Sequence, residues 1–85
     1  MNTYLFSKRA LEDFKNLPKN KQAFILNKLE YFTSTDQPLV FAKTLINFNL
    51  GQYRFRVGDY RITFDLGSDG TIIILHIGHR REIYR

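Results

Sequence analysis

The segment YRFRVGDYRITF, residues 53–64, decides the fold of this 85-residue chain. Apolar residues alternate with arginine before Gly58-Asp59 and with mostly polar residues after it. Such alternation has the two-residue period of a strand with one buried face. Gly58 can supply the positive φ that a two-residue hairpin loop requires. The segment therefore predicts two antiparallel strands joined by a tight turn.

The position of the loop fixes which residues face one another across the predicted hairpin. Arg56 lies directly opposite Arg61, and Arg54 lies opposite Thr63, one pair further along. Three arginines then share one face of the sheet, while the aromatic and branched apolar residues share the other. Like charges directly opposite each other destabilise a sheet. This face therefore predicts either a solvated polar surface or a surface that binds a polyanion.

The flanking sequence predicts the other elements. Upstream, residues 4–6 fit a short edge strand, Ser7 fits a helix N-cap, and Pro18 fits the start of a second helix. Downstream, residues 71–75 are apolar on both faces, which predicts a strand inside the sheet. The expected apolar helix positions are Ala10, Leu11, Phe14 and Leu17, then Ile25, Leu26, Leu29 and Phe32.

This order of elements, strand-helix-helix-strand-strand-strand, predicts an α+β fold. We expect a single domain over residues 1–85, with an antiparallel sheet of about four strands and the N-terminal helical hairpin packed on one face. Residues 33–50 show no clean period, and part of this stretch is expected to be helical.

Composition narrows the classes of function. The chain carries 13 Lys and Arg against 8 Asp and Glu, and it contains no Cys, which excludes a disulfide framework and Cys-ligated zinc. His76 and His79 have no clear third ligand, so no metal and no cofactor are expected. No apolar run reaches membrane-spanning length and no secretory signal is visible, so we expect a soluble cytoplasmic protein without a membrane partner.

The placement of the charge is more informative than its total of +5. Six of the seven arginines follow residue 50, and arginine suits phosphate because its planar fork binds two oxygens. In the tail, His79 can exchange a proton near neutral pH, and Tyr84 can stack on a base. Arg80 and Arg81 can hold a phosphate. A surface histidine followed by a plain edge strand fits the same residues, so both interpretations remain open.

Residues 51–62, GQYRFRVGDYRI, followed by residues 77–84, IGHRREIY, closely resemble the RelE family of toxins from bacterial and archaeal toxin–antitoxin pairs. The resemblance covers nearly the whole chain, and the final His-Arg-Arg and Tyr favour the RelE branch of the RelE/ParE superfamily over the ParE branch. It implies a ribosome-dependent mRNA endonuclease that works in the A site, beside 16S rRNA, and inhibits translation. The RNA 2′-oxygen attacks the adjacent phosphate without a metal, which leaves a 2′,3′-cyclic end and a free 5′-hydroxyl.

The resemblance also implies roles by position. Two arginines match those that grip the scissile phosphate, and the C-terminal tyrosine matches one that orients the substrate base. A lysine lies near the general base of some relatives, and a histidine is a further proton-transfer candidate. The two arginines are Arg61 and Arg80, and the tyrosine is Tyr84. The lysine is Lys43, and the histidine is His79. The residues expected to contact RNA are Arg54, Arg56 and Arg81.

The implied partner is an acidic antitoxin that is partly disordered when free, and contact with DNA is expected only through it. The sequence ends one residue after Tyr84, so we expect no C-terminal helix of the kind that an antitoxin displaces in certain pairs. Two alternatives use the same fold. One is a ParE-like, non-enzymatic inhibitor of DNA gyrase, and the other is a non-toxic basic RNA-binding module.

Overall fold

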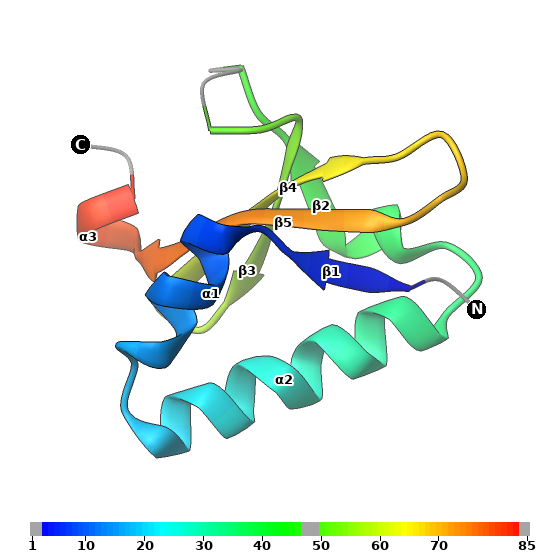
Figure 1. Cartoon of the computed structure of the whole chain (residues 1–85). Coiled ribbons are helices and arrows are strands. Elements are labelled where there is room, and N and C mark those ends of the chain that lie inside the picture. Colours follow the sequence, from blue (N-terminus) through cyan, green and yellow to red (C-terminus); the bar gives the residue numbers. More distant parts are fainter. Residues whose placement is uncertain (1–2, 47–49, 84–85) are drawn as a thin grey trace.

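The computed structural model describes residues 3–46 and 50–83 and has the expected α+β architecture (Figure 1). A sheet of five strands has the order β1-β5-β4-β3-β2, and α2 crosses one of its faces. In chain order, the elements are β1 (Tyr4–Phe6), α1 (Lys8–Lys15), α2 (Lys19–Ser34), the 3-10 helix η1 (Pro38–Phe41), β2 (Ala42–Thr44), β3 (Tyr53–Val57), β4 (Tyr60–Leu66), β5 (Ile72–His79) and α3 (Arg80–Ile83).

The hairpin formed by β3 and β4 has the predicted register. Arg56 pairs with Arg61, and Arg54 pairs with Thr63. Gly58 has φ +59°, the conformation that a type II′ turn requires at its first central position. Because the turn holds the register, the three arginines lie on one face of the sheet and the apolar residues on the other.

The predicted fold class is confirmed, and the sheet departs from the expected antiparallel sheet of about four strands only at its two edges. At one edge, β1 pairs with β5 in parallel, with Tyr4 beside Ile72. No hairpin links these two strands, so the path through the helices, and not a tight turn, sets their relative direction. At the other edge, β2 is a fifth strand that pairs with β3. With three residues it is too short to show a period, which is why the sequence did not reveal it.

The two helices begin and end close to the predicted positions. The Ser7 hydroxyl accepts a hydrogen bond from the Ala10 N–H at 3.1 Å, which caps α1. Pro18 immediately precedes α2. Most of the expected apolar positions face the core, but Leu11 is 39% exposed and lies outside it. An eight-residue helix can bury only part of its surface against one sheet face.

Stacked aromatic rings form the centre of the core between α2 and the sheet. The ring centroid of Phe55 lies 4.7 Å from that of Phe32 and 4.4 Å from that of Phe64. Phe55 and Phe64 are completely buried. Each ring therefore contributes apolar burial together with favourable ring geometry, and the contact between Phe32 and Phe55 links α2 to the hairpin.

After the last strand, Arg80–Ile83 form the single-turn helix α3, which the sequence analysis did not predict. In α3, Ile83 packs against Gly78 of β5. A Cβ placed on Gly78 would lie 3.3 Å from the Ile83 Cδ1 atom. The glycine therefore leaves the space in which this single helical turn folds back over the sheet.

Replacing Tyr4 with phenylalanine is expected to remove a pH-dependent contribution to stability. The Tyr4 hydroxyl donates to Glu30 Oε1 at 2.8 Å and links β1 to α2. Burial, with help from the Glu30 carboxylate, raises the pKa of Tyr4 from 10 to about 12. Because the folded state holds this proton more tightly, the contribution is complete below pH 10 and is lost as the pH rises towards 12.

Urea unfolding of both proteins measures this effect. At pH 7 the variant should be less stable by about 0.5–1.5 kcal/mol, and the difference should shrink between pH 10 and 12. A constant difference across this range would contradict the assigned role of the hydroxyl.

Candidate nucleic-acid interface

The sheet face that carries Arg54, Arg56 and Arg61, named here the arginine face, is the candidate site. Arg61 is only 9% exposed, and its Nη1 atom donates to the backbone oxygens of Gly58 and Tyr60, both at 3.0 Å. The sequence predicted a phosphate-gripping arginine here. The structure shows that this side chain also holds the hairpin loop.

Arg80 joins Arg56 and Arg61 at the hairpin tip. Its backbone N–H donates to the Asp59 oxygen at 2.8 Å, and its side-chain Nε lies 3.8 Å from Asp59 Oδ1. The Arg80 side chain is half exposed, and Arg56, directly opposite Arg61, is exposed as well. We name Arg56, Arg61 and Arg80 the tip cluster. Within residues 3–46 and 50–83, the carboxylate of Asp59 lies beside the cluster, and a group of guanidinium side chains at one loop is suited to an anion.

A second row of residues crosses four strands beside the tip cluster. Lys43 of β2 pairs with Arg54 of β3, which pairs with Thr63 of β4, which in turn pairs with His76 of β5. Directly paired residues share a face, and neighbouring strands lie about 4.8 Å apart. The row therefore places two cations and an imidazole across the width of the arginine face. Lys43 is exposed, and Arg54 and His76 are half-buried.

Thr63, at the middle of this row, is completely buried. Its hydroxyl oxygen has no hydrogen-bond partner within the described residues. A buried polar group without a partner costs about 1–3 kcal/mol.

His79 does not lie with the arginines. It pairs with Tyr60 on the helix-covered face, where the two ring centroids are 5.8 Å apart. Its Nδ1 atom accepts a hydrogen bond from the Arg81 backbone N–H at 3.2 Å. Residues of a strand alternate between faces, and the histidine on the arginine face is His76, to which the sequence analysis assigned no role in the reaction. Gly78 pairs with Arg61, and His76 lies two residues before Gly78 on the same strand. This two-residue spacing was the signal that could have placed His76 on the arginine face.

Two further predicted site residues follow Arg80 in the sequence. Arg81 is exposed on this helix, next to Arg80. Tyr84 lies outside the described residues, so its predicted contact with a base is not placed.

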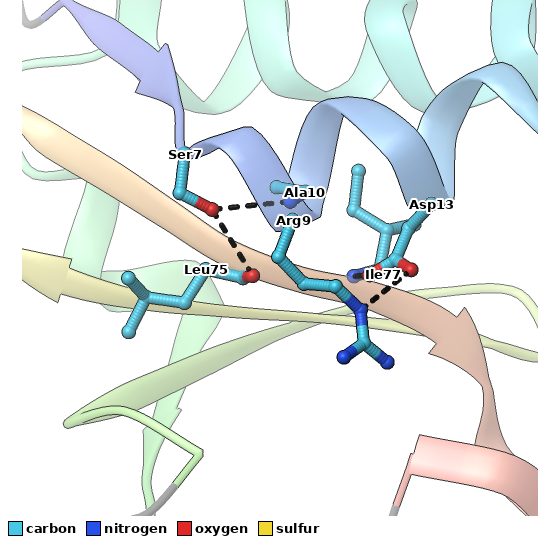
Figure 2. Close-up of polar contacts among 6 residues, drawn as sticks. All are labelled: Ser7, Arg9, Ala10, Asp13, Leu75 and Ile77. Carbon is cyan, nitrogen blue, oxygen red and sulfur yellow. Dashed lines mark hydrogen bonds and ion pairs between the residues drawn. The ribbon is translucent and has the colours of Figure 1, made fainter.

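Sequence reasoning overlooked the outer edge of β5, where α1 takes the place of a strand. The pairing with β1 ends at Ile74, and beyond it Ser7 donates its hydroxyl to the Leu75 oxygen at 3.2 Å. The Ile77 N–H donates to Asp13 Oδ2 at 3.1 Å, and the other oxygen of Asp13 accepts from Arg9 Nε at 3.1 Å. Figure 2 shows these contacts, with the Arg9 guanidinium extending across β5.

Within residues 3–46 and 50–83, no group of three His, Cys, Asp or Glu side chains is arranged to hold a metal ion. No helix in this part of the chain is long and apolar enough to cross a membrane.

Comparison with known proteins identifies relatives of this fold and site. Residues 4–84 match the model of the ParE toxin of the type II toxin–antitoxin system parDE. Toxin RelE3 of Methanocaldococcus jannaschii is 30% identical over 83 residues, which cover 94% of this chain and 92% of the relative.

Two solved structures support the same relationship. The RelB–RelE antitoxin–toxin complex from Methanococcus jannaschii matches with a TM-score of 0.72 and 29% identity, over 94% of each chain. The RelBE2 toxin–antitoxin complex from Mycobacterium tuberculosis matches with a TM-score of 0.68 and 29% identity, over 92% of this chain and 96% of the other.

The fold, the arginine face and these matches define the class of protein: a toxin of a type II toxin–antitoxin system. The chain belongs to the RelE/ParE toxin family. The expectation that the resemblance raised is thereby confirmed at the level of the family.

Proposed function

We propose that this toxin is a ribosome-dependent mRNA endonuclease that cuts mRNA in the ribosomal A site, in the cytoplasm. The observation that carries the proposal is the tip cluster, in which arginines from β3, β4 and α3 meet at one hairpin loop. Cleavage by internal attack develops negative charge on the scissile phosphate, and fixed guanidinium groups stabilise such charge. The likeness to toxin RelE3 supports the same branch of the family.

In the proposed reaction, the RNA 2′-oxygen forms a bond to the adjacent phosphorus, and the bond from phosphorus to the 5′-oxygen breaks. A base removes the proton of the 2′-hydroxyl, and an acid donates a proton to the departing 5′-oxygen. No metal participates, as the resemblance implies. Arg56 and Arg80, the exposed members of the tip cluster, hold the phosphate oxygens, while Arg61 adds positive charge from beneath and fixes the loop.

The other predicted residues flank this position. Lys43 and Arg54 lie in the neighbouring row and would bind the RNA backbone, with Lys43 able to act as the base only when neutral. His76 shares the face of the scissile phosphate, which makes it a better placed proton-transfer group than His79. Tyr84 stacks on the substrate base in this proposal, and Arg81 adds a further RNA contact.

A cognate antitoxin would inhibit the toxin. The solved relatives are complexes of a toxin with an antitoxin, and the basic surface of this chain suits an acidic partner. We propose that the antitoxin covers the arginine face or wraps the helices, and that DNA is contacted only through it.

A cleavage assay with purified ribosomes tests the proposed function. The expected result is a cut within the A-site codon of a programmed mRNA, with the same mRNA left intact when ribosomes are omitted. The new 5′ ends should accept label from polynucleotide kinase without prior phosphatase treatment, because internal attack leaves a 5′-hydroxyl. Intact mRNA on programmed ribosomes would contradict the proposal.

The match to the ParE toxin model keeps gyrase inhibition as the second candidate function. Its signature would be a DNA-damage response after induction of the toxin, with mRNA intact and supercoiling by purified gyrase inhibited. A toxin that cuts mRNA and leaves gyrase active excludes this candidate. Harmless expression without any partner would instead point to a non-toxic RNA-binding module.

A further inference from the structure

A hollow between α1 and α3 lies beside the arginine face, and of the residues that line it only His76 has a part in the reaction proposed above. Its volume is about 250 Å³. Its lining includes Arg9 and Asp13 from α1, His76 from β5, and Glu82 and Ile83 from α3. Pockets for drug-sized ligands measure about 300–1,000 Å³, so this hollow suits a single flat group such as one nucleobase.

The fold holds Arg9 in a defined position at this hollow. Asp13 accepts from the Ile77 backbone N–H with one oxygen and from Arg9 Nε with the other, so the sheet edge itself orients the guanidinium. Within the described residues, the terminal nitrogens of Arg9 contact no other polar group. The planar end of the side chain is therefore oriented and still available to a ligand.

The charges around the hollow select the chemistry of the ligand. Besides Arg9, the lining carries the carboxylates of Asp13 and Glu82, of which only Asp13 has an ion-pair partner in the described part of the chain. Two carboxylates disfavour a phosphate. A neutral base that accepts hydrogen bonds at one edge and donates them at another satisfies Arg9 and Glu82 together. Guanine has this pattern, since arginine pairs with its O6 and N7 atoms and its N1–H and N2–H groups are donors.

The hollow adjoins the site proposed for the scissile phosphate. Gly78, on its floor, pairs directly with Arg61 of the tip cluster, and His76 pairs with Thr63 in the neighbouring row. One strand spacing, about 4.8 Å, separates each pair. An RNA whose phosphate lies on the tip cluster can therefore turn a neighbouring, unstacked base into the hollow.

We propose that this hollow binds a guanine base of the RNA substrate, with Arg9 at the O6 and N7 edge and Glu82 at the N1 and N2 edge. The proposal rests on the proposed function in that it takes RNA as the substrate. It assigns a base-recognition role to Arg9, Glu82 and Asp13, with Asp13 as the residue that positions Arg9.

Binding of short, uncleavable RNAs to the full chain tests the proposal. Two 2′-O-methyl hexanucleotides, one with uracil at all positions and one with a single guanine, are compared by fluorescence anisotropy. The guanine oligonucleotide should bind about tenfold more tightly, the effect of one good bidentate pair. Arg9→Gln and Glu82→Ala should each reduce this ratio to about one. Asp13→Asn keeps an oxygen for the Ile77 N–H and should also lower the ratio.

Lys8→Gln is the matched control, because it removes the same charge from the exposed surface of α1 next to Arg9, and it should keep the ratio near tenfold. A wild-type ratio near one overturns the proposal. If Glu82→Ala tightens the binding of both oligonucleotides by the same factor, a phosphate occupies the hollow and the proposal is likewise wrong.

A second measurement separates failure of this proposal from failure of the proposed function. If neither hexanucleotide binds, RNA binding by the arginine face is contradicted. Titration of the ¹⁵N-labelled chain with guanosine and with uridine then tests the hollow alone. Shifts of the Ile77 and Gly78 amide signals with guanosine only support the base site, and equal shifts or none overturn it.

Discussion

Replacing Arg80 with alanine is expected to lower the single-turnover rate of ribosome-dependent mRNA cleavage by about 100- to 1,000-fold, the usual effect of losing one group that stabilises transition-state charge. The fold should survive this change. The Arg80 side chain is half exposed, and its 3.8 Å contact with Asp59 is a surface ion pair of little energetic value. The backbone hydrogen bond from Arg80 to Asp59 does not depend on the side chain.

Two further variants make this result specific. Arg80→Lys keeps the charge but loses the planar fork, so its rate should fall between those of the wild type and Arg80→Ala. Lys28→Ala removes one positive charge from the exposed surface of α2, away from the arginine face, and should leave the rate unchanged. A rate for Arg80→Ala within threefold of the wild type would show that the tip cluster is not the catalytic centre.

Replacing Phe55 with alanine is expected to destabilise the protein by about 3–5 kcal/mol, the range for a buried phenylalanine. Phe55 is completely buried; its ring stacks on Phe64 of β4 and lies tilted against Phe32 of α2. Domains of this size are stable by about 4–13 kcal/mol in total. The variant should therefore lose a large part of its stability, and a substantial unfolded fraction at 37 °C is expected.

Urea unfolding followed by circular dichroism measures this loss as a lower midpoint with an unchanged slope. Phe24→Ala is the matched control, because it removes the same atoms from a side chain that is 39% exposed on α2, and it should cost about 1 kcal/mol. An equal cost for the two variants would contradict the assignment of the ring stack as the link between helix and sheet.

Local features of the chain were predicted well because they depend on neighbouring residues. The alternation around Gly58 set the β3–β4 register, and with it the placement of Arg54, Arg56 and Arg61 on one face. Ser7 and Pro18 set the start of the helices by capping and by loss of a backbone N–H. The motif in this hairpin, taken with the tail, also led to the family.

Features that join distant segments were not predictable in the same way. The parallel pairing of β1 with β5 depends on the route of the chain through two helices. The sequence analysis selected His79 for proton transfer, whereas the pairing of β5 with β4 places His76 on the arginine face. The burial of Arg61 under its own hairpin loop was likewise invisible, because alternation gives the face of a residue but not the contacts of its side chain.

The sequence by itself determined a basic hairpin, two helices and the family to which they belong, since each follows from period, caps and a contiguous motif. Only the tertiary structure decided which charges meet. Arg80 reaches the tip cluster because the last strand ends beside Asp59. Arg9 reaches the same end of the sheet because Asp13 accepts hydrogen bonds both from the Ile77 N–H of β5 and from Arg9 Nε. Residues more than 50 positions apart come together there, and the hydrogen bonds that bring them together do not exist until the sheet has formed.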